Sequence, residues 1–226
     1  MSKVPGTNIA LLSDPSKMPG KAWGMTARKA CFRLNGDICG GCYAEKGAYV
    51  WSNVRAAYDA RFHWAMECMR TPEGRDEFVA VMTRAIGRTK EDYFRVHDSG
   101  DFLSAAYAEC WFRIALALPN KRFWFPTRVW QRPAAKSAES PFVVVGQADP
   151  LMTAVRKLAS LPNVTVRPSA LNVGDDAPVV DGLHAGSSVD YSGAAHKCIA
   201  PQQQGKCGDC RHCWDNKFVP VDYAKH

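Results

Sequence analysis

The chain has 226 residues, of which 46% are apolar and 11% aromatic, and carries a formal net charge of +7. This composition excludes a disordered tail, and the length suits one domain or one domain with a small appendage. No stretch approaches the roughly 20 apolar residues of a membrane span, and the first residues do not resemble a signal peptide. We therefore expect a cytoplasmic protein, in which the nine cysteines are metal ligands, redox groups or core residues rather than disulfides.

The first motif in the chain is a group of three cysteines, Cys31, Cys39 and Cys42, with the spacing C-x7-C-x2-C. A tight C-x2-C pair with a third cysteine nearby indicates metal ligation. The metal would be a cluster with one open iron or an ion completed by a distant residue. A redox pair and structural packing remain as alternatives for this group.

Hydrophobic periodicity predicts helices and strands in the middle of the chain. The first four predicted elements are helices at residues 50–70 and 74–87, a strand at 93–96 and a helix at 103–118. The isolated cysteines Cys68 and Cys110 fall on apolar faces of the first and last of these helices. We interpret both as small core residues, because free cysteine is among the most buried residue types.

The predicted strand 93–96 leads into four polar residues, His97, Asp98, Ser99 and Asp101. On an extended segment His97 and Ser99 would point the same way. A histidine base, a serine nucleophile and an orienting carboxylate would suit ester or amide hydrolysis. The alternative is that the two aspartates and the serine form turns and helix caps around a buried histidine.

The sequence Leu-Pro-Asn followed by a strand then occurs twice, at residues 118–125 and 161–167. Further elements are a helix that begins near Asp149 and short strands within 142–145 and 179–191. Repeated α/β units predict parallel strands in a full or partial TIM-like barrel, with a doubly wound sheet as the alternative. Functional groups collect at the carboxyl ends of such strands, so Arg128 and Arg167 join the candidate catalytic residues as holders of an anionic group.

The chain closes with four cysteines, Cys198, Cys207, Cys210 and Cys213. Their surroundings are rich in glutamine and glycine, so metal binding must supply the stability that a core would give. The C-x2-C-x2-C run matches ferredoxin-type ligation, with Cys198 as the fourth ligand. We predict a 4Fe–4S or 3Fe–4S cluster, or zinc as the alternative, in a C-terminal segment of residues 193–226 that follows an α/β domain of residues 1–192.

Together these motifs resemble a bacteriophage family called gene product eighty-eight. The resemblance spans about residues 25–216 and rests on four motifs, which are the first three cysteines with Tyr43-Ala44, residues 95–102, the strand that ends in Thr127-Arg128, and residues 205–214. It implies a phage protein in the host cytoplasm, with no particular reaction. A more distant likeness is to radical SAM enzymes, whose partial barrels carry a C-x3-C-x2-C loop, although the first gap here is longer.

Three functions follow from these observations. The first is an iron–sulfur enzyme that does hydrolytic, ester or acyl chemistry on a small-molecule substrate at the strand ends. The second is a radical-SAM-like enzyme that binds SAM at an open cluster held by the first three cysteines. The third is a zinc module that binds nucleic acid or a host protein, which the net charge of +7 suggests.

Overall fold

The computed structural model describes residues 2–31, 42–131, 149–169, 180–189 and 195–223. The helices are α1 (Ser52–Met69), α2 (Pro72–Gly87), α3 (Ala105–Ala117), α4 (Pro150–Ala159) and α5 (His212–Asp215), with short 3-10 turns η1 (Tyr43–Glu45), η2 (Gly47–Val50), η3 (Val129–Gln131) and η4 (Ala200–Gln203). The strands are β1 (Ala22–Trp23), β2 (Tyr93–Val96), β3 (Arg122–Thr127), β4 (Val164–Pro168), β5 (Ser187–Val189), β6 (His196–Lys197) and β7 (Val221–Tyr223). The predicted helices are confirmed, with ends that differ by at most two residues.

Four parallel strands form the main sheet, in the order β1-β2-β3-β4 that follows the chain. Phe94 of β2 pairs with Phe123 of β3, which pairs in turn with Val164 of β4. The prediction of parallel strands from repeated α/β units is therefore confirmed. The order lacks the reversal that defines a doubly wound sheet. Within the described residues the sheet is open, so a barrel is not confirmed, and the predicted strand at 142–145 lies outside those residues.

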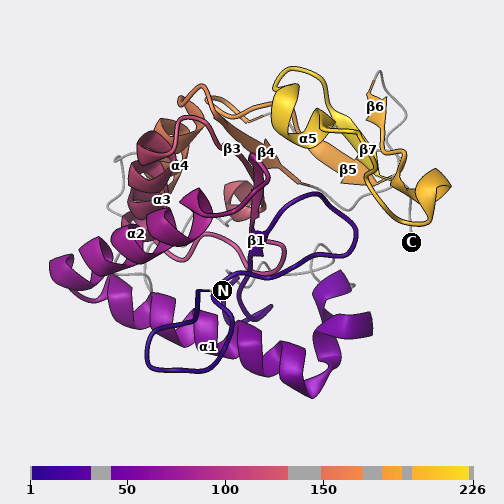
Figure 1. Cartoon of the computed structure of the whole chain (residues 1–226). Coiled ribbons are helices and arrows are strands. Elements are labelled where there is room, and N and C mark those ends of the chain that lie inside the picture. Colours follow the sequence, from indigo (N-terminus) through magenta and orange to yellow (C-terminus); the bar gives the residue numbers. More distant parts are fainter. Residues whose placement is uncertain (1, 32–41, 132–148, 170–179, 190–194, 224–226) are drawn as a thin grey trace.

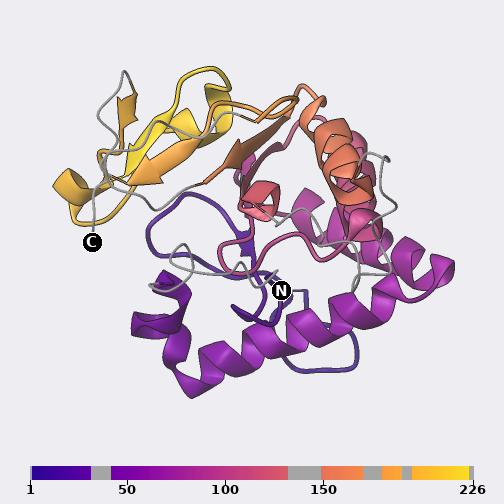
Figure 2. The ribbon, with the colours of Figure 1, turned by 180° about the vertical axis from the view of Figure 1, so that it is seen from behind.

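Helices α2, α3 and α4 cover one face of this sheet, and α1 packs against α2 (Figures 1 and 2). Alternate strand residues point into this layer, so that Phe94 and Phe125 are fully buried there. Trp111 of α3 contacts both, with ring centroids 6.4 and 5.7 Å away. Cys68 and Cys110 are also buried, which confirms that they are core residues.

Side-chain caps fix the ends of the helices. Ser104 accepts a hydrogen bond from the backbone N–H of Tyr107 at the start of α3, and Asp149 accepts one from Leu151 at the start of α4. Asn163, from the second Leu-Pro-Asn sequence, donates its amide hydrogens to the carbonyls of Ala115, Leu118 and Lys121. The repeat thus has a physical role, because its asparagine closes the end of the preceding α/β unit.

The C-terminal segment covers the opposite face of the sheet, with α5 against β3 and β4 (Figure 1). Its strands form a second parallel sheet in the order β5-β7-β6. Trp214 of α5 packs on Trp124 of β3 at 5.2 Å between centroids, and its indole N–H donates to the Phe94 carbonyl. Because β5 precedes residue 193, the small sheet takes strands from both sides of the predicted domain boundary. No helix of the described ranges has the length and apolar character needed to cross a membrane.

Candidate functional site

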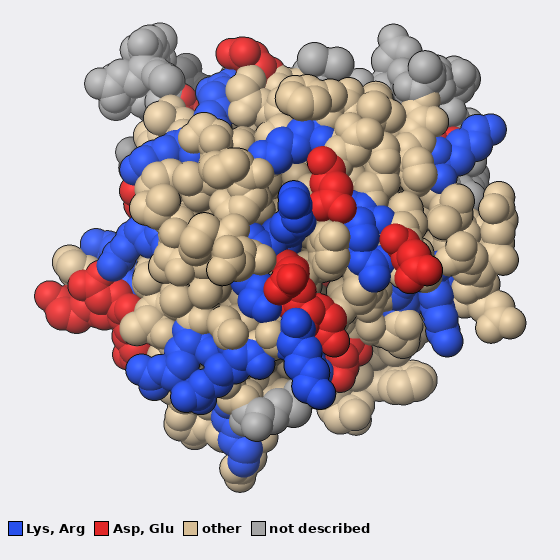
Figure 3. Space-filling view, turned by 45° about the horizontal axis from the view of Figure 1, so that its top comes forward, with Lys and Arg blue, Asp and Glu red and all other residues tan. Residues whose placement is uncertain are grey.

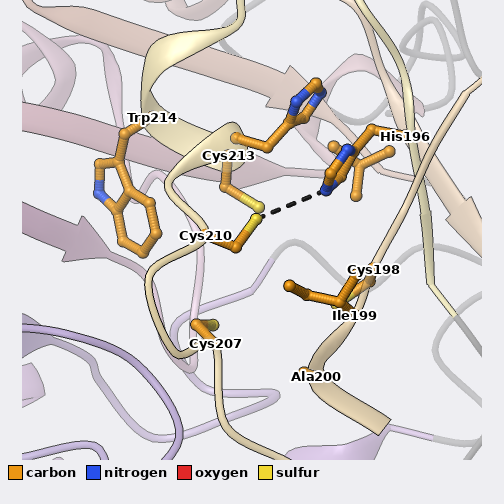
Figure 4. A pocket seen from close by; sticks show the side chains of 10 residues that line it. His196, Cys198, Ile199, Ala200, Cys207, Cys210, Cys213 and Trp214 are labelled. Atoms are coloured by element: carbon orange, nitrogen blue, oxygen red, sulfur yellow. Dashed lines mark hydrogen bonds between the residues drawn. The ribbon is translucent and has the colours of Figure 1, made fainter. Parts of the chain in front are cut away.

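The four C-terminal cysteines border one small, largely apolar cavity (Figure 4). Cys198 follows β6, Cys207 and Cys210 lie in the loop before α5, and Cys213 lies within α5. The loop turns tightly, since Cys210 donates its backbone N–H to the Cys207 carbonyl at 3.0 Å. Between them Gly208 has a φ of 53°, and a Cβ there would lie 2.2 Å from a side-chain oxygen. Glycine at this position therefore allows the loop to bring both thiols to the same cavity.

Two polar side chains stand beside the thiols. The Nε2 atom of His196 lies 3.4 Å from Cys210 Sγ, and its ring stacks on His212 with centroids 3.9 Å apart (Figure 4). The Tyr223 hydroxyl lies 3.4 Å from Cys213 Sγ. We did not identify His196 from the sequence, although it is two residues before Cys198 and strand alternation would place the two on one side.

Burial controls the protonation of these thiols. It raises the pKa of Cys198, of Cys207 and of Cys213, the last to about 11. Neighbouring cysteines of the group raise each of these pKa values further, because thiolates at close range repel one another. The thiol of Cys213 is therefore protonated at neutral pH, and a bound cation would reverse this by favouring the thiolate.

Arg167 lies beneath the cysteines rather than at an open strand end. Its side chain is fully buried, and within the described residues it donates hydrogen bonds only to backbone carbonyls, those of Ala185, Val219, His212, Cys213 and Asn216. Burial lowers the pKa of the guanidinium, and the neighbouring Cys213 and Tyr223 act in the opposite direction. Arg167 thus attaches α5 to β4 and places a positive charge directly behind Cys213.

A second arginine, Arg95 of β2, connects the cysteines with the strand ends. Its guanidinium lies over the ring of Trp124, 4.7 Å from the centroid, and donates to the Tyr43 hydroxyl at 3.1 Å. Although burial lowers the pKa of Arg95, Tyr43 and other neighbours raise it above its ordinary value. The charge of Arg95 in turn lowers the pKa of Cys207. The sequence carried a signal for it, since it is a charged residue within an apolar strand.

Asp98, at the end of β2, organises a tyrosine cluster made of Tyr43, Tyr49 and Tyr58. Its Oδ2 accepts hydrogen bonds from Ser13 at 3.0 Å and Tyr58 at 2.7 Å. Its backbone carbonyl accepts from Tyr43 at 2.6 Å and Tyr49 at 3.3 Å. The half-exposed ring of Tyr43 thus ends in a buried hydroxyl. Sequence reasoning missed this cluster, because its members come from separate turns and helices.

Asp101 joins the ends of two strands. It accepts hydrogen bonds from the Thr127 hydroxyl at 2.7 Å and from the Arg128 backbone N–H at 2.8 Å, both at the end of β3. Burial raises the pKa of Asp101, while these hydrogen bonds lower it. The Arg128 side chain adds a favourable charge near the same carboxylate. Asp101 therefore has the turn-forming role that the sequence left open as the alternative to catalysis, and Arg128 lies beside it.

The ring of His97 is enclosed by aromatic side chains, those of Phe102, Tyr107 and Phe125. Neither ring nitrogen has a hydrogen-bond partner in the described part of the chain, and the nearest Asp101 oxygen is 3.9 Å from Nδ1. Burial, followed by the charge of Arg95, lowers the pKa of His97 to about 3, so the ring is neutral. Its φ is 64°. The backbone is therefore not extended here, and the expectation that His97 and Ser99 point the same way was wrong.

Ser99 lines a second cavity, of about 240 Å³, at the carboxyl end of β2. The other walls of this cavity are Thr26, Ala27, Ala44, Glu45, Tyr49, Val50, Arg55 and Tyr58. Of the six predicted catalytic residues, Ser99 alone lines it. The structure thus separates Ser99 from the ring of His97, and no hydrogen bond joins the two.

Metal ligation by the first three cysteines stays a prediction, because the structure describes only two of them. Cys31 and Cys42 are partly buried, and Cys39 lies outside the described residues. Within the described ranges, no three or more His, Cys, Asp or Glu side chains are arranged to hold a single metal ion. On the face seen in Figure 3, basic and acidic side chains are interspersed, without a continuous basic surface.

Comparison with known proteins identifies one relationship. Neither the curated proteins nor the solved structures contain a match to the chain. No comparison shows the likeness to radical SAM enzymes. The family model described as Gene product 88 matches residues 8–216, a range that includes the end of β2 and all four C-terminal cysteines. Since this match covers most of its length, the chain belongs to the Gene product 88 family.

Proposed function

We propose that the protein holds an iron–sulfur cluster through Cys198, Cys207, Cys210 and Cys213. The observation that carries this proposal is that the four thiols border one cavity, on a segment with little apolar core of its own. A phage protein acts in the reducing cytoplasm of its host, where thiols stay available for ligation. Cys198, Cys207, Cys210 and Cys213 are free of disulfides, as such a role requires.

The charges around the cavity support an anionic occupant. Arg167 is buried and Arg95 half-buried near the thiols, and neither forms an ion pair with a carboxylate among the described residues. A buried cation without an anionic partner is costly. Four thiolates around a 4Fe–4S core of charge 2+ leave about −2, which balances two guanidinium groups.

A zinc ion with four thiolates would carry the same net charge, so charge does not separate the two metals. The preference for a cluster comes from the spacing of the ligands. Structural zinc usually takes two C-x2-C pairs from separated turns. Three cysteines at successive x2 spacings, with a fourth from elsewhere, are typical of iron–sulfur ligation.

The sequential strand order, with α2, α3 and α4 together on one face, fits our proposal that the sheet is part of an incomplete barrel. The cluster would then lie on the inner face of that barrel, and a small-molecule substrate would bind at the strand ends. Hydrolysis stays a prediction, and the separation of Ser99 from the His97 ring gives it less support than the cysteines give the cluster.

The test is the metal content of anaerobically purified protein. We expect a brown protein with about four irons and four sulfides per chain, and loss of both in Cys207→Ser and in Cys210→Ser. Cys110→Ser is the matched control, because Cys110 is buried in the helix layer. Cys42→Ser tests whether the first cysteine group also contributes to iron binding. A colourless protein with stoichiometric zinc, or iron retained in Cys207→Ser, would refute the proposal.

A further inference from the structure

The cavity of about 240 Å³ at the end of β2 has no lining residue in common with the cysteine cavity. It contains an unusual hydroxyl group. Ser99 is 4% exposed, lines this cavity and forms no side-chain hydrogen bond with any described residue. The hydroxyl is reached through the cavity, so it can donate or accept a hydrogen bond there. A ligand atom in the cavity would supply the missing partner.

An exposed arginine supplies a positive charge at this cavity. Arg55, on the first turn of α1, lines it and forms no ion pair with any described carboxylate. The three acidic side chains nearby already have protein partners, which for Asp98 are the hydroxyl groups described above. Glu45 forms an ion pair with Arg28, and Asp59 forms one with Lys29 at 2.9 Å. An anionic group in the cavity would therefore meet Arg55 without competition from a protein carboxylate.

The start of α1 adds further donors. This helix has 18 residues, begins after Trp51 with no side-chain cap, and has no acidic residue in its first turn. The first N–H groups of a helix lack partners within the helix, and they carry the positive end of its dipole. Val50 and Arg55, on either side of this helix start, both line the cavity, so the positive end of the helix dipole lies close to it. Helix starts of this kind bind phosphate and carboxylate groups.

The remaining wall is mostly apolar or aromatic, with Tyr49, Ala27 and Ala44 among its members, and also contains Thr26. The volume of the cavity, about 240 Å³, is below the roughly 300–1,000 Å³ of pockets that bind drug-sized ligands. We propose that this cavity binds a small organic oxyanion. Its phosphate or carboxylate group is held by Arg55, Ser99 and the start of α1, and its apolar body lies against Tyr49. This binding does not depend on the proposed cluster.

Three probes of similar size test the proposal by calorimetric titration of the full-length protein. Phenyl phosphate and benzoate carry the two candidate anionic groups, and benzamide is the neutral counterpart. We expect at least one anion to bind roughly tenfold or more tightly than benzamide, and its affinity to fall as salt increases. The relative affinities of the two anions identify which group the cavity prefers. Equal binding of all three, or no binding, would refute the proposal.

Variants locate the binding at this cavity. Arg55→Gln is expected to weaken binding of the anion by roughly tenfold, and Ser99→Ala by a smaller factor. Arg88→Gln is the matched control, because Arg88 is an exposed arginine. It precedes β2, whereas the cavity lies at the carboxyl end of that strand. Cys207→Ser should bind the anion like the unmodified protein, so failure of the cluster proposal would leave this result intact. Unchanged binding in Arg55→Gln would contradict the assignment.

Discussion

The two faces of the main sheet differ in what holds them to the rest of the molecule. On the helix face, the buried rings of Phe94 and Phe125 pack directly against the ring of Trp111. On the other face, Thr165 and Arg167 hold the C-terminal segment through hydrogen bonds to its carbonyls. The same strands thus supply an apolar core on one side and a polar platform on the other.

This difference separates stability from chemistry. Apolar burial on the helix face is non-directional and needs no ligand. The polar face positions groups accurately, but the cysteine segment on it has few apolar residues to hold it in place. We therefore expect the helix face to fold without metal, whereas the C-terminal segment should gain much of its stability from metal binding.

The largest effect is expected from truncation in the helix face. Phe125→Ala should reduce the free energy of unfolding by about 3–5 kcal/mol, because it removes a ring that contacts Phe102, Trp111 and His97 and leaves a cavity. Urea denaturation measures this loss. Leu116→Ala is the control, since Leu116 is 59% exposed on α3. A loss below about 1 kcal/mol in Phe125→Ala would show that this face does not carry the stability.

A change beneath the cysteines should act locally. Arg167→Met keeps the volume but removes the donors that attach α5 to β4, at an expected cost of about 3 kcal/mol to the local stability of this segment. Amide hydrogen exchange should accelerate in α5 and β7 and remain slow in α3. Arg156→Met is the control, because the Arg156 side chain donates to the Asp181 carbonyl near the surface. Equal acceleration in α3 would remove the distinction between the two faces.

The sequence predicted the elements well where the signal is local. Periodic apolar residues located α3, and the last four cysteines, which their spacing grouped together, border one cavity. The orientation of His97 could not be predicted in this way, because its φ of 64° interrupts the alternation on which the prediction depended. The contacts of Arg95 and of the tyrosine cluster could not be predicted, because they join residues that are far apart in the chain. No short sequence pattern records such contacts.

The smallest expected effect is a pH dependence of the free energy of unfolding that comes from His97, whose ring is buried in the helix-face core. Its pKa of about 3 in the folded protein compares with about 6.5 in the unfolded chain. Above pH 6.5 the ring is neutral in both states and has no effect on stability. Below pH 6.5 the unfolded chain binds a proton that the folded protein does not, so the free energy of unfolding falls by about 1.4 kcal/mol per pH unit.

His97→Leu should remove this term, so the difference in stability between the variant and the unmodified protein should shift by about 2 kcal/mol between pH 6.5 and pH 5. Leucine at a φ of 64° adds a strain that is the same at every pH, so the slope rather than the absolute stability carries the result. His184, whose pKa is also lowered by burial, and Asp101 titrate in both proteins and cancel in the comparison. His63→Leu, at an exposed position of α1, is the control. Parallel pH profiles for His97→Leu and the unmodified protein would mean that the ring reaches solvent, and that the aromatic face of the sheet is less closed than its packing indicates.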